Sequence, residues 1–220
     1  MIILAPSLLA SDFSNLESEI KKVYMDGNGC KYLHLDVMDG VFVKNISFGA
    51  PVIASIRKVC GIIFDVHLMI INPARYIAEF IDAGADIITF HYEACGNDGE
   101  ILETIDLINK RGKKCGISLK PETSVNVLLP FLDKLGMVLI MSVEPGFGGQ
   151  KFIEESLDKI KGLHKIKSEN NYKFDIQVDG GVTLGNVKKI REAGANVIVA
   201  GSSVFGAEDI GGAIKGFMCV

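Results

Sequence analysis

Four residues of this chain have the types needed to hold a metal ion together: His34, Asp36, His67 and Asp179. Each is expected at the end of a short apolar run of the kind that forms a β-strand. Imidazole nitrogens and carboxylate oxygens are common ligands of divalent zinc, iron, manganese and cobalt. If the strands bring these side chains together, the sequence predicts a site for one divalent cation.

The first two of these residues share one strand-like segment, which reads YLHLDVM at positions 32–38. Side chains two positions apart in a strand point to the same face, so His34, Asp36 and Met38 should share a face. This one short segment therefore offers two ligands to one point.

Glycine-rich segments follow three other apolar runs. They are Gly146-Phe147-Gly148-Gly149, Asp179-Gly180-Gly181 and Gly201-Ser202-Ser203. Glycine lets the backbone approach an anion closely, and N–H groups at a helix start can bind phosphate without many basic side chains. None of the segments matches a Walker loop or a dinucleotide fingerprint, which argues against ATP and NAD. We expect a bound phosphate facing the metal, with segment 146–149 as a third wall and a mobile lid.

Length and composition fit one catalytic domain covering residues 1–220. The chain has 220 residues, 48% of them hydrophobic and 23% charged, which is enough for a large core and argues against global disorder. Its net charge of −4 gives no basic footprint, so we expect neither nucleic acid nor a membrane as a partner. A small anionic substrate remains compatible with this composition.

The cysteines and the first residues of the chain bear on the cellular compartment of the protein. The five cysteines are widely spaced, without the paired spacings of a structural zinc site or a disulfide framework. The first residues are apolar but lack a basic region and soon meet Pro6, and no apolar run approaches the roughly 18 residues of a membrane span. We therefore expect a cytoplasmic protein.

Strand-like runs alternate with segments of helical period along the chain. We expect eight strands, over residues 2–9, 32–38, 63–69, 86–91, 114–119, 137–143, 173–179 and 196–200. Helices are expected over residues 14–25, 73–83, 99–110, 156–167 and 184–193, with a weaker one over 125–134 that Pro130 interrupts. Most of the runs are apolar on both faces, as buried parallel strands are. The pattern predicts an α/β protein with a single (β/α)₈ TIM barrel.

Two further features fit this barrel. The segment from Asp82 to Ile88 recurs as the segment from Glu192 to Ile198, where each predicted helix would end at a left-handed Gly before the next strand. Active sites of such barrels lie at the carboxyl ends of the strands, and phosphate is often bound after the seventh and eighth. The second and third glycine-rich segments stand in those two places.

Seven segments, found in order along the chain, carry a family resemblance. They are Ala5-Pro6-Ser7, His34-Leu35-Asp36-Val37-Met38-Asp39-Gly40, Phe64-Asp65-Val66-His67-Leu68-Met69, Thr89-Phe90-His91-Tyr92-Glu93-Ala94, Pro145-Gly146-Phe147-Gly148-Gly149-Gln150, Val178-Asp179-Gly180-Gly181 and Ala200-Gly201-Ser202. On these motifs the chain closely resembles the ribulose-phosphate 3-epimerase family. The motifs span almost the whole chain, and their common order makes the resemblance specific.

The resemblance implies an isomerase that interconverts D-ribulose 5-phosphate and D-xylulose 5-phosphate with one divalent metal ion. It implies that His34, Asp36, His67 and Asp179 are the metal ligands, and that Asp36 and Asp179 are the catalytic pair that exchanges the proton at carbon 3. The substrate-binding residues it implies are Ser7, Met38, His67, Met69, Met141, Gly146, Phe147, Gly148, Gly149, Gly180, Gly181, Gly201 and Ser202. It also suggests a homo-oligomer.

This chemistry explains the residue types. Removing a proton beside a ketone leaves an enediolate, whose charge a divalent cation stabilises. Inverting a carbon centre requires a proton acceptor on one face and a donor on the other, so two carboxyl groups suit it better than one. Zinc is the metal we expect, although the two-His, two-Asp set is also compatible with iron, manganese or cobalt. The methionines would supply a polarisable, water-poor wall.

Each residue taken alone has a simpler interpretation. A single His in a barrel strand is more often structural than a ligand, a lone Asp can cap a helix, and a core Met usually fills a gap. The conjunction of two His and two Asp favours the metal. We interpret His91, outside the implied ligand set, as structural. Ser203 departs from the family pattern, which commonly has a small apolar residue there.

Three other functions fit parts of the pattern. A related 3-epimerase could act on a hexulose phosphate such as allulose 6-phosphate, and pocket length would decide. Another phosphate-binding barrel, a decarboxylase or a synthase, would need a catalytic Lys or a different acid pair. A non-catalytic sugar-phosphate binding barrel would bind ligand without isomerising it.

Overall fold

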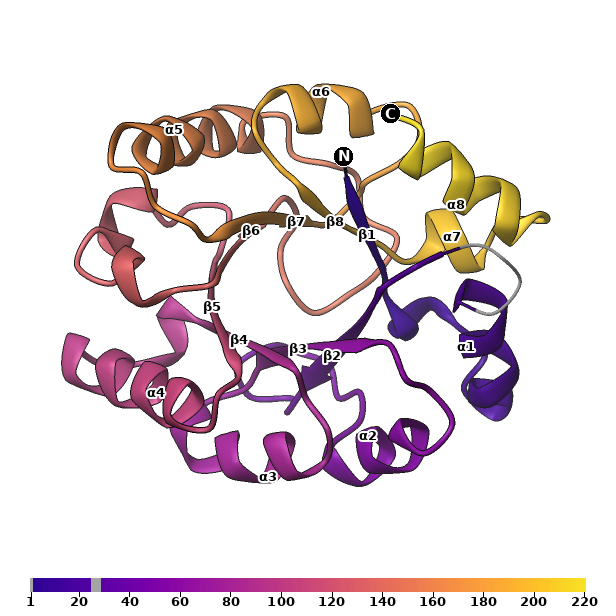
Figure 1. The fold of residues 1–220 in the computed structure, drawn as a ribbon, viewed down its shortest axis with the longest axis horizontal. Helices are drawn as coiled ribbons and strands as arrows, with labels where there is room; N and C mark the ends of the chain where they lie inside the picture. Colours follow the sequence, from indigo (N-terminus) through magenta and orange to yellow (C-terminus); the bar gives the residue numbers. More distant parts are fainter. Residues whose placement is uncertain (1, 25–28) are drawn as a thin grey trace.

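Eight parallel strands form one sheet that curves into a barrel in this computed structural model, which describes residues 2–24 and 29–220 (Figure 1). The strands are β1 (Ile3–Pro6), β2 (Tyr32–Met38), β3 (Ile63–Met69), β4 (Ile87–His91), β5 (Lys114–Leu119), β6 (Met137–Met141), β7 (Asp175–Asp179) and β8 (Val197–Ala200). Their neighbour order is β1-β8-β7-β6-β5-β4-β3-β2. A parallel bridge between Ser7 and His34 joins the chain after β1 to β2. The predicted TIM barrel is confirmed.

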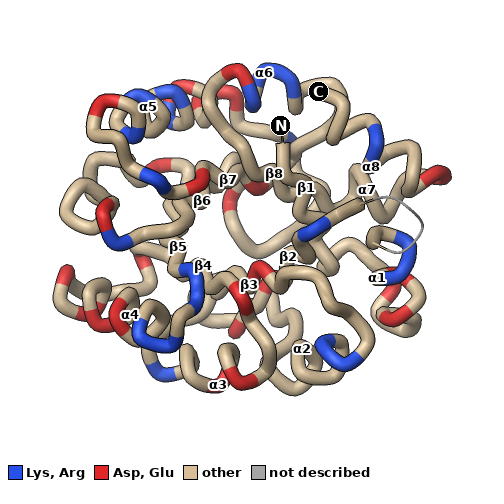
Figure 2. The backbone as a smooth tube through the Cα atoms, viewed as in Figure 1, with Lys and Arg blue, Asp and Glu red and all other residues tan. Residues whose placement is uncertain are grey.

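Helices surround the barrel on its outside (Figure 1). They are α1 (Leu16–Tyr24), α2 (Ala50–Arg57), α3 (Ile77–Asp82), α4 (Asp98–Lys110), α5 (Ser156–Glu169), α6 (Val187–Glu192), α7 (Ser202–Phe205) and α8 (Ile210–Met218). Each longer helix turns an apolar stripe inward; α4, for example, buries Ile101, Ile105 and Ile108. Figure 2 shows Lys and Arg interspersed with Asp and Glu along the outer helices. No helix in the described part of the chain combines the length and apolar character needed to cross a bilayer.

Some predicted elements differ from those observed. The helix predicted over 125–134 is wrong: the chain makes two 3₁₀ turns there, Val125–Leu128 and Leu132–Lys134, because Pro130 between them cannot donate a helical hydrogen bond. The first strand stops at Pro6, since Leu8–Ala10 forms a 3₁₀ turn. The first helix begins at Leu16, and its predicted end at Met25 lies outside the described residues.

Three helices, α2, α7 and α8, were not predicted; α7 is a single turn, and α2 and α8 carried too little signal. Pro51 lies in the first turn of α2, where its missing N–H costs no helical hydrogen bond. In a sequence pattern, however, a proline usually indicates the end of a helix. Three glycines weaken the helical pattern of α8, and packing of Ala213, Ile214 and Phe217 against the core compensates.

Alternation along the strands gives the barrel two different faces. Leu33, Leu35 and Val37 of β2 belong to the apolar core between the strands and the helices. The side chains between them, including His34 and Asp36, face the barrel interior and are buried as well. The period-two interpretation of this segment is therefore confirmed, and the strand carries polar groups into the centre of the molecule.

The repeated helix-to-strand turn also has the predicted form. Gly84 and Gly194 have φ values of +111° and +119°, directly after α3 and α6 and their capping alanines. A Cβ atom at Gly194 would lie 2.5 Å from the Cβ of His164 on α5. Both the backbone angle and the close packing therefore require glycine here.

Replacing Gly194 by Ala should lower the free energy of unfolding by about 2 kcal/mol, because it adds backbone strain and a clash. Gly162→Ala is the matched control, since Gly162 lies inside α5 and a Cβ there meets nothing within 4 Å. The control should raise stability by about 0.5–1 kcal/mol through helix propensity. Urea unfolding measures both, and equal effects would contradict the role of Gly194.

Candidate active site

The four predicted metal ligands come together inside the barrel. One nitrogen or oxygen from each of His34, Asp36, His67 and Asp179 lies within 4.8 Å of those of the other three. Asp36 on β2 is the register partner of His67 on β3, and Asp179 is the last residue of β7. His34 and His67 lie within their strands rather than at the strand ends, and neither is exposed.

The environment of His34 fits a bound cation. Its Nδ1 lies 2.8 Å from Asp65 Oδ2, which holds the proton on that nitrogen. Its Nε2 lies 3.3 Å from Asp36 Oδ1 and makes no well-directed hydrogen bond within the described part of the chain. A buried nitrogen without a partner is costly unless something else binds it. A divalent cation among the four residues would remove this cost.

The carboxyl groups of the cluster are shifted in opposite directions. Burial raises the pKa of Asp36, but the charge of His34 and the close approach of the His34 and His67 rings outweigh burial and hold this pKa well below its usual range. Burial and the negative charge of Asp36 raise the pKa of Asp179 to about 6. Burial lowers the pKa of His34, but Asp36 and Asp65 outweigh it and raise this pKa well above its ordinary value. Positive charge is thus favoured at the centre of the cluster.

Each histidine of the cluster is held from behind by residues that sequence reasoning did not single out as functional. Asp65 Oδ2 also accepts a hydrogen bond from Gln177 Nε2, and neither residue is exposed. His67 Nε2 lies 2.9 Å from Nε2 of His91. Asp65 could have been found, because it precedes His67 by two positions and so shares its face of β3.

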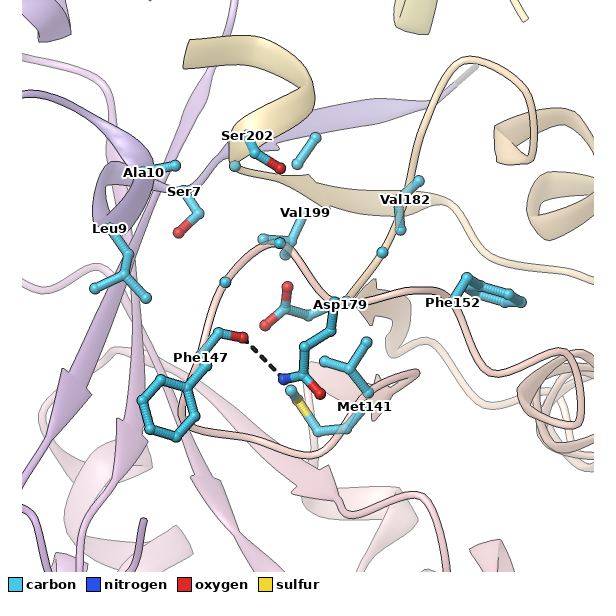
Figure 3. Close-up of a pocket in the computed structure, with 18 of the residues that line it drawn as sticks. Ser7, Leu9, Ala10, Met141, Phe147, Phe152, Asp179, Val182, Val199 and Ser202 are labelled. Carbon is cyan, nitrogen blue, oxygen red and sulfur yellow. Dashed lines mark hydrogen bonds between the residues drawn. The ribbon is translucent and has the colours of Figure 1, made fainter. Parts of the chain in front are cut away.

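A cavity of about 600 Å³ opens at the carboxyl ends of the strands, a size suited to a small sugar phosphate. Asp36 and Asp179 line it, and Figure 3 shows Asp179 together with Met141, Ser7 and Ser202 around the same space. The predicted substrate-binding residues on its wall are Ser7, Met38, Met69, Met141, Gly146, Phe147, Gly148, Gly149, Gly180, Gly181, Gly201 and Ser202. Only His67, among the predicted substrate contacts, lies outside this lining.

The wall nearest the carboxylates combines one hydroxyl with sulfur. Ser7 Oγ donates a 2.6 Å hydrogen bond to Asp36 Oδ2, on the oxygen other than the one facing the histidines. Met38 and Met69 are register partners and pack together. They and Met141 are at most 4% exposed. This end of the cavity is therefore lined by buried methionines beside Ser7 and the two carboxyl groups.

The opposite wall consists of the loops after β7 and β8. Gly181 has a φ of +64°, and a Cβ there would lie 2.3 Å from the backbone nitrogen of Phe152. Ser203 Oγ donates a 2.7 Å hydrogen bond to the carbonyl of Val182, which ties the two loops together. The hydroxyl that departs from the family pattern thus has a partner within the protein.

The third glycine-rich segment closes one side of the cavity. Asn45 Nδ2 donates to the carbonyl of Gly146 at 2.9 Å, and Gln150 Nε2 donates to that of Phe147 at 2.9 Å (dashed in Figure 3). Phe147 is 56% exposed although its backbone carbonyl is held by Gln150. An exposed aromatic ring at the cavity mouth is suited to cover a ligand.

Comparison with known proteins decides the family. The model of the ribulose-phosphate 3-epimerase family matches residues 3–205. A ribulose-phosphate 3-epimerase of Bacillus subtilis is 47% identical over 210 residues, covering 95% of this chain and 94% of that protein. The chain belongs to the ribulose-phosphate 3-epimerase family. The predicted enzyme class, an isomerase, is confirmed with it.

Other relatives give the same family and the same fold. The chloroplastic ribulose-5-phosphate-3-epimerase of Arabidopsis thaliana is 46% identical over 98% of this chain and 75% of that protein. Among solved structures, 3-hexulose-6-phosphate synthase of Salmonella typhimurium has a TM-score of 0.71 at 18% identity, covering 98% of this chain and 96% of that one. KGPDC from Streptococcus mutans has a TM-score of 0.71 at 16% identity, covering 100% and 96%. At such identities the structural likeness shows the barrel alone.

The raised pKa of Asp179 predicts an unusual effect of Asp179→Asn on this family member. Between 3.8 and about 6 the folded state binds more protons than the unfolded state, so stability falls as pH rises through this window. Asn cannot ionise. With metal removed by a chelator, the variant should exceed the wild type in free energy of unfolding by about 1–3 kcal/mol near pH 8 and by little near pH 4.

Urea unfolding at the two pH values measures this difference. Excess zinc should stabilise the wild type more than the variant, which has lost a ligand. Equal stability of the two proteins at both pH values would contradict the raised pKa.

Proposed function

We propose that the protein is a metal-dependent epimerase that interconverts D-ribulose 5-phosphate and D-xylulose 5-phosphate by moving one proton at carbon 3. The observation that carries this proposal is the meeting of two carboxyl groups, Asp36 and Asp179, in one cavity walled by glycine-rich loops. The names of the relatives supply the substrate, and the arrangement of the side chains supplies the reaction type.

The two carboxyl groups reach the cavity from different sides of the barrel. Asp36 lies on β2 and Asp179 on β7, with β1 and β8 between these strands in the sheet order. One carboxylate would accept the proton from carbon 3, which leaves an enediolate, and the other carboxyl group would return a proton to the opposite face. Their roles exchange when the reaction runs in reverse. A single base on one side would regenerate the starting sugar.

The four clustered residues, His34, Asp36, His67 and Asp179, would hold one divalent cation, with zinc as the expected metal. When bound, the cation supplies positive charge that offsets the charge developing on the substrate oxygens beside carbon 3. The hydrogen bond from Ser7 keeps Asp36 in one orientation while it exchanges the proton. Met38, Met69 and Met141 exclude water there and offer no competing acid or base.

The loops on the other wall would hold the phosphate. Gly180, Gly181, Gly201 and Ser202 line the same cavity as the carboxylates, and their backbone N–H groups would donate to the phosphate. Glycine permits the close approach, and a dianion anchored there fixes the position of carbon 3. Phe147 and its neighbours would cover the bound sugar.

Several further expectations stay predictions from the sequence. These are a single catalytic domain over residues 1–220, a homo-oligomeric state, a cytoplasmic location and zinc as the physiological metal. Of these, the assay below tests which of the candidate metals supports turnover best.

The decisive assay follows ribulose 5-phosphate in deuterated water. We expect xylulose 5-phosphate to form with one deuterium at carbon 3, because the proton passes through groups that exchange with solvent. A chelator should abolish turnover, and zinc, iron, manganese or cobalt should restore it to different extents. Epimerisation without solvent label, or full activity after metal removal, would contradict the proposed reaction.

Asp36→Asn should lower kcat by about 100-fold or more, since general acid–base groups contribute factors of this size and the amide cannot accept the proton. Asp106→Asn is a matched control, because Asp106 is exposed on α4 and pairs only with Lys110 in the surrounding helix. Steady-state kinetics of both variants, with circular dichroism to verify folding, tests the role. Near-native kcat in Asp36→Asn would remove Asp36 from proton transfer.

A further inference from the structure

A line of buried hydrogen-bonding groups leads away from the candidate metal centre on the side of β4. His67 Nδ1 faces the cluster, 3.2 Å from Asp36 Oδ1. Its other nitrogen, Nε2, lies 2.9 Å from His91 Nε2, and His91 Nδ1 lies 3.3 Å from Glu93 Oε2. Three successive groups are thus linked by their ring nitrogens and a carboxylate. The reaction proposed above uses neither His91 nor Glu93.

The far end of this line is firmly anchored. Glu93 Oε1 accepts hydrogen bonds from the backbone nitrogen of Lys120, at 2.8 Å, and from the hydroxyl of Thr123. All these donors fix Glu93 as an ionised acceptor, and its pKa accordingly lies low, at about 2. A fixed carboxylate cannot donate a proton to His91, so the hydrogen between them must belong to His91 Nδ1.

The same logic fixes every proton along the line. With its hydrogen on Nδ1, neutral His91 has a lone pair on Nε2 and accepts there. His67 must then carry its hydrogen on Nε2 and donate it to His91. The lone pair of His67 therefore lies on Nδ1, which is the nitrogen that faces Asp36 and Asp179. A metal ion can bind only that lone pair.

Packing holds the two rings in this arrangement. The rings of His67 and His91 stack with centroids 4.9 Å apart, and Phe42 packs on the other side of His91 at 4.8 Å. Neither histidine is exposed, so water does not compete for these hydrogen bonds. The arrangement parallels that of His34, whose second nitrogen is held by Asp65.

We propose that His91 and Glu93 are positioning residues of the metal centre, which orient His67 and select the tautomer that presents Nδ1 to the cation. The proposal rests on the metal centre of the proposed function and assigns a role to two residues that do not touch the metal or the substrate. Neighbours that fix a ligating histidine commonly change metal affinity by about 10- to 100-fold when replaced.

Two variants break the line in different ways. His91→Phe keeps an aromatic ring between His67 and Phe42 but removes the acceptor for His67 Nε2. Glu93→Gln is nearly isosteric: its carbonyl oxygen can still serve Lys120 and Thr123, which turns its NH₂ donor toward His91. That donor forces His91 to carry its hydrogen on Nε2, which reverses the proton order and moves the hydrogen of His67 to Nδ1.

Two further variants serve as controls. His91→Gln can accept from His67 through its oxygen and donate to Glu93 through its nitrogen, so it should restore the original order. Glu100→Gln makes the same chemical change on α4, where Glu100 serves Gly96 and Asn97 instead of His91.

The test measures zinc affinity of each purified chain by competition with a chromophoric chelator, after metal removal. We expect His91→Phe and Glu93→Gln to bind zinc about 10- to 100-fold more weakly than the wild type. His91→Gln and Glu100→Gln should remain within about fivefold of it. Thermal unfolding of the metal-free proteins reports folding separately, and kcat at saturating zinc should largely recover in each variant. A purely structural role would lower metal-free stability without this affinity pattern.

The outcomes separate this proposal from the proposed reaction. Wild-type zinc affinity in both His91→Phe and Glu93→Gln overturns the positioning role, whatever the activity. If His91→Phe does not fold, Glu93→Gln alone decides. A wild type that binds zinc but does not epimerise overturns the reaction, while the affinity ratios still decide the role of His91 and Glu93. A wild type that binds no divalent metal overturns both.

Discussion

The meeting of two buried imidazoles, the buried carboxyl group of Asp36 and the partly buried one of Asp179 inside the barrel is the constraint on which the site depends. Charged groups in such surroundings are costly unless each is paired and hydrogen-bonded. His34, Asp36 and His67 meet this condition through Asp65, Ser7 and His91. Within the described residues, Nε2 of His34 still has no hydrogen-bond partner, and the pKa of Asp179 is raised. Both are relieved by one positive ion, so the same arrangement that weakens the metal-free fold favours a cation.

The barrel supplies the geometry that this burial needs. Parallel strands place all carboxyl ends at one rim, so the loops after β6, β7 and β8 meet around the cavity that Asp36 and Asp179 line. Alternation along each strand separates an apolar outer face, packed on the helices, from an inner face free to carry polar groups. In the proposed reaction, the rigid strands would hold the proton-exchanging groups, and the glycine-rich loops would hold the phosphate, where close backbone approach matters more than side chains.

The sequence could predict features that depend on neighbouring residues, but not those that depend on contacts between residues far apart in the chain. The strands and the inward face of β2 follow from local periodicity, and Gly84 and Gly194 from a local turn. Helix α8 could not be predicted, because its glycines are offset by packing against distant residues. The sequence pointed to Asp36 and Asp179 because each is a charged residue within or at the end of an otherwise apolar strand. Gln177, 112 positions from Asp65, gave no local signal of its contact, and the orientation of His91 depends on Glu93 and a loop beyond β5.

The strand register also explains why the two histidines present different nitrogens. His34 is the register partner of Asp65, and Asp36 is the register partner of His67. The first pair lies two residues earlier along β2 and β3, in a lower layer of inward-facing side chains. From that lower layer only the distal Nε2 can reach toward the cluster, and the proximal Nδ1 meets Asp65 beside it. His67, level with Asp36, presents its proximal Nδ1, which leaves the distal Nε2 to extend toward β4. An acceptor at that distance must come from the next strand, where His91 stands. Under the proposed positioning role, the alignment of β2, β3 and β4 explains why the acceptor for His67 is a histidine of β4 rather than a second Asp at the position of a register partner.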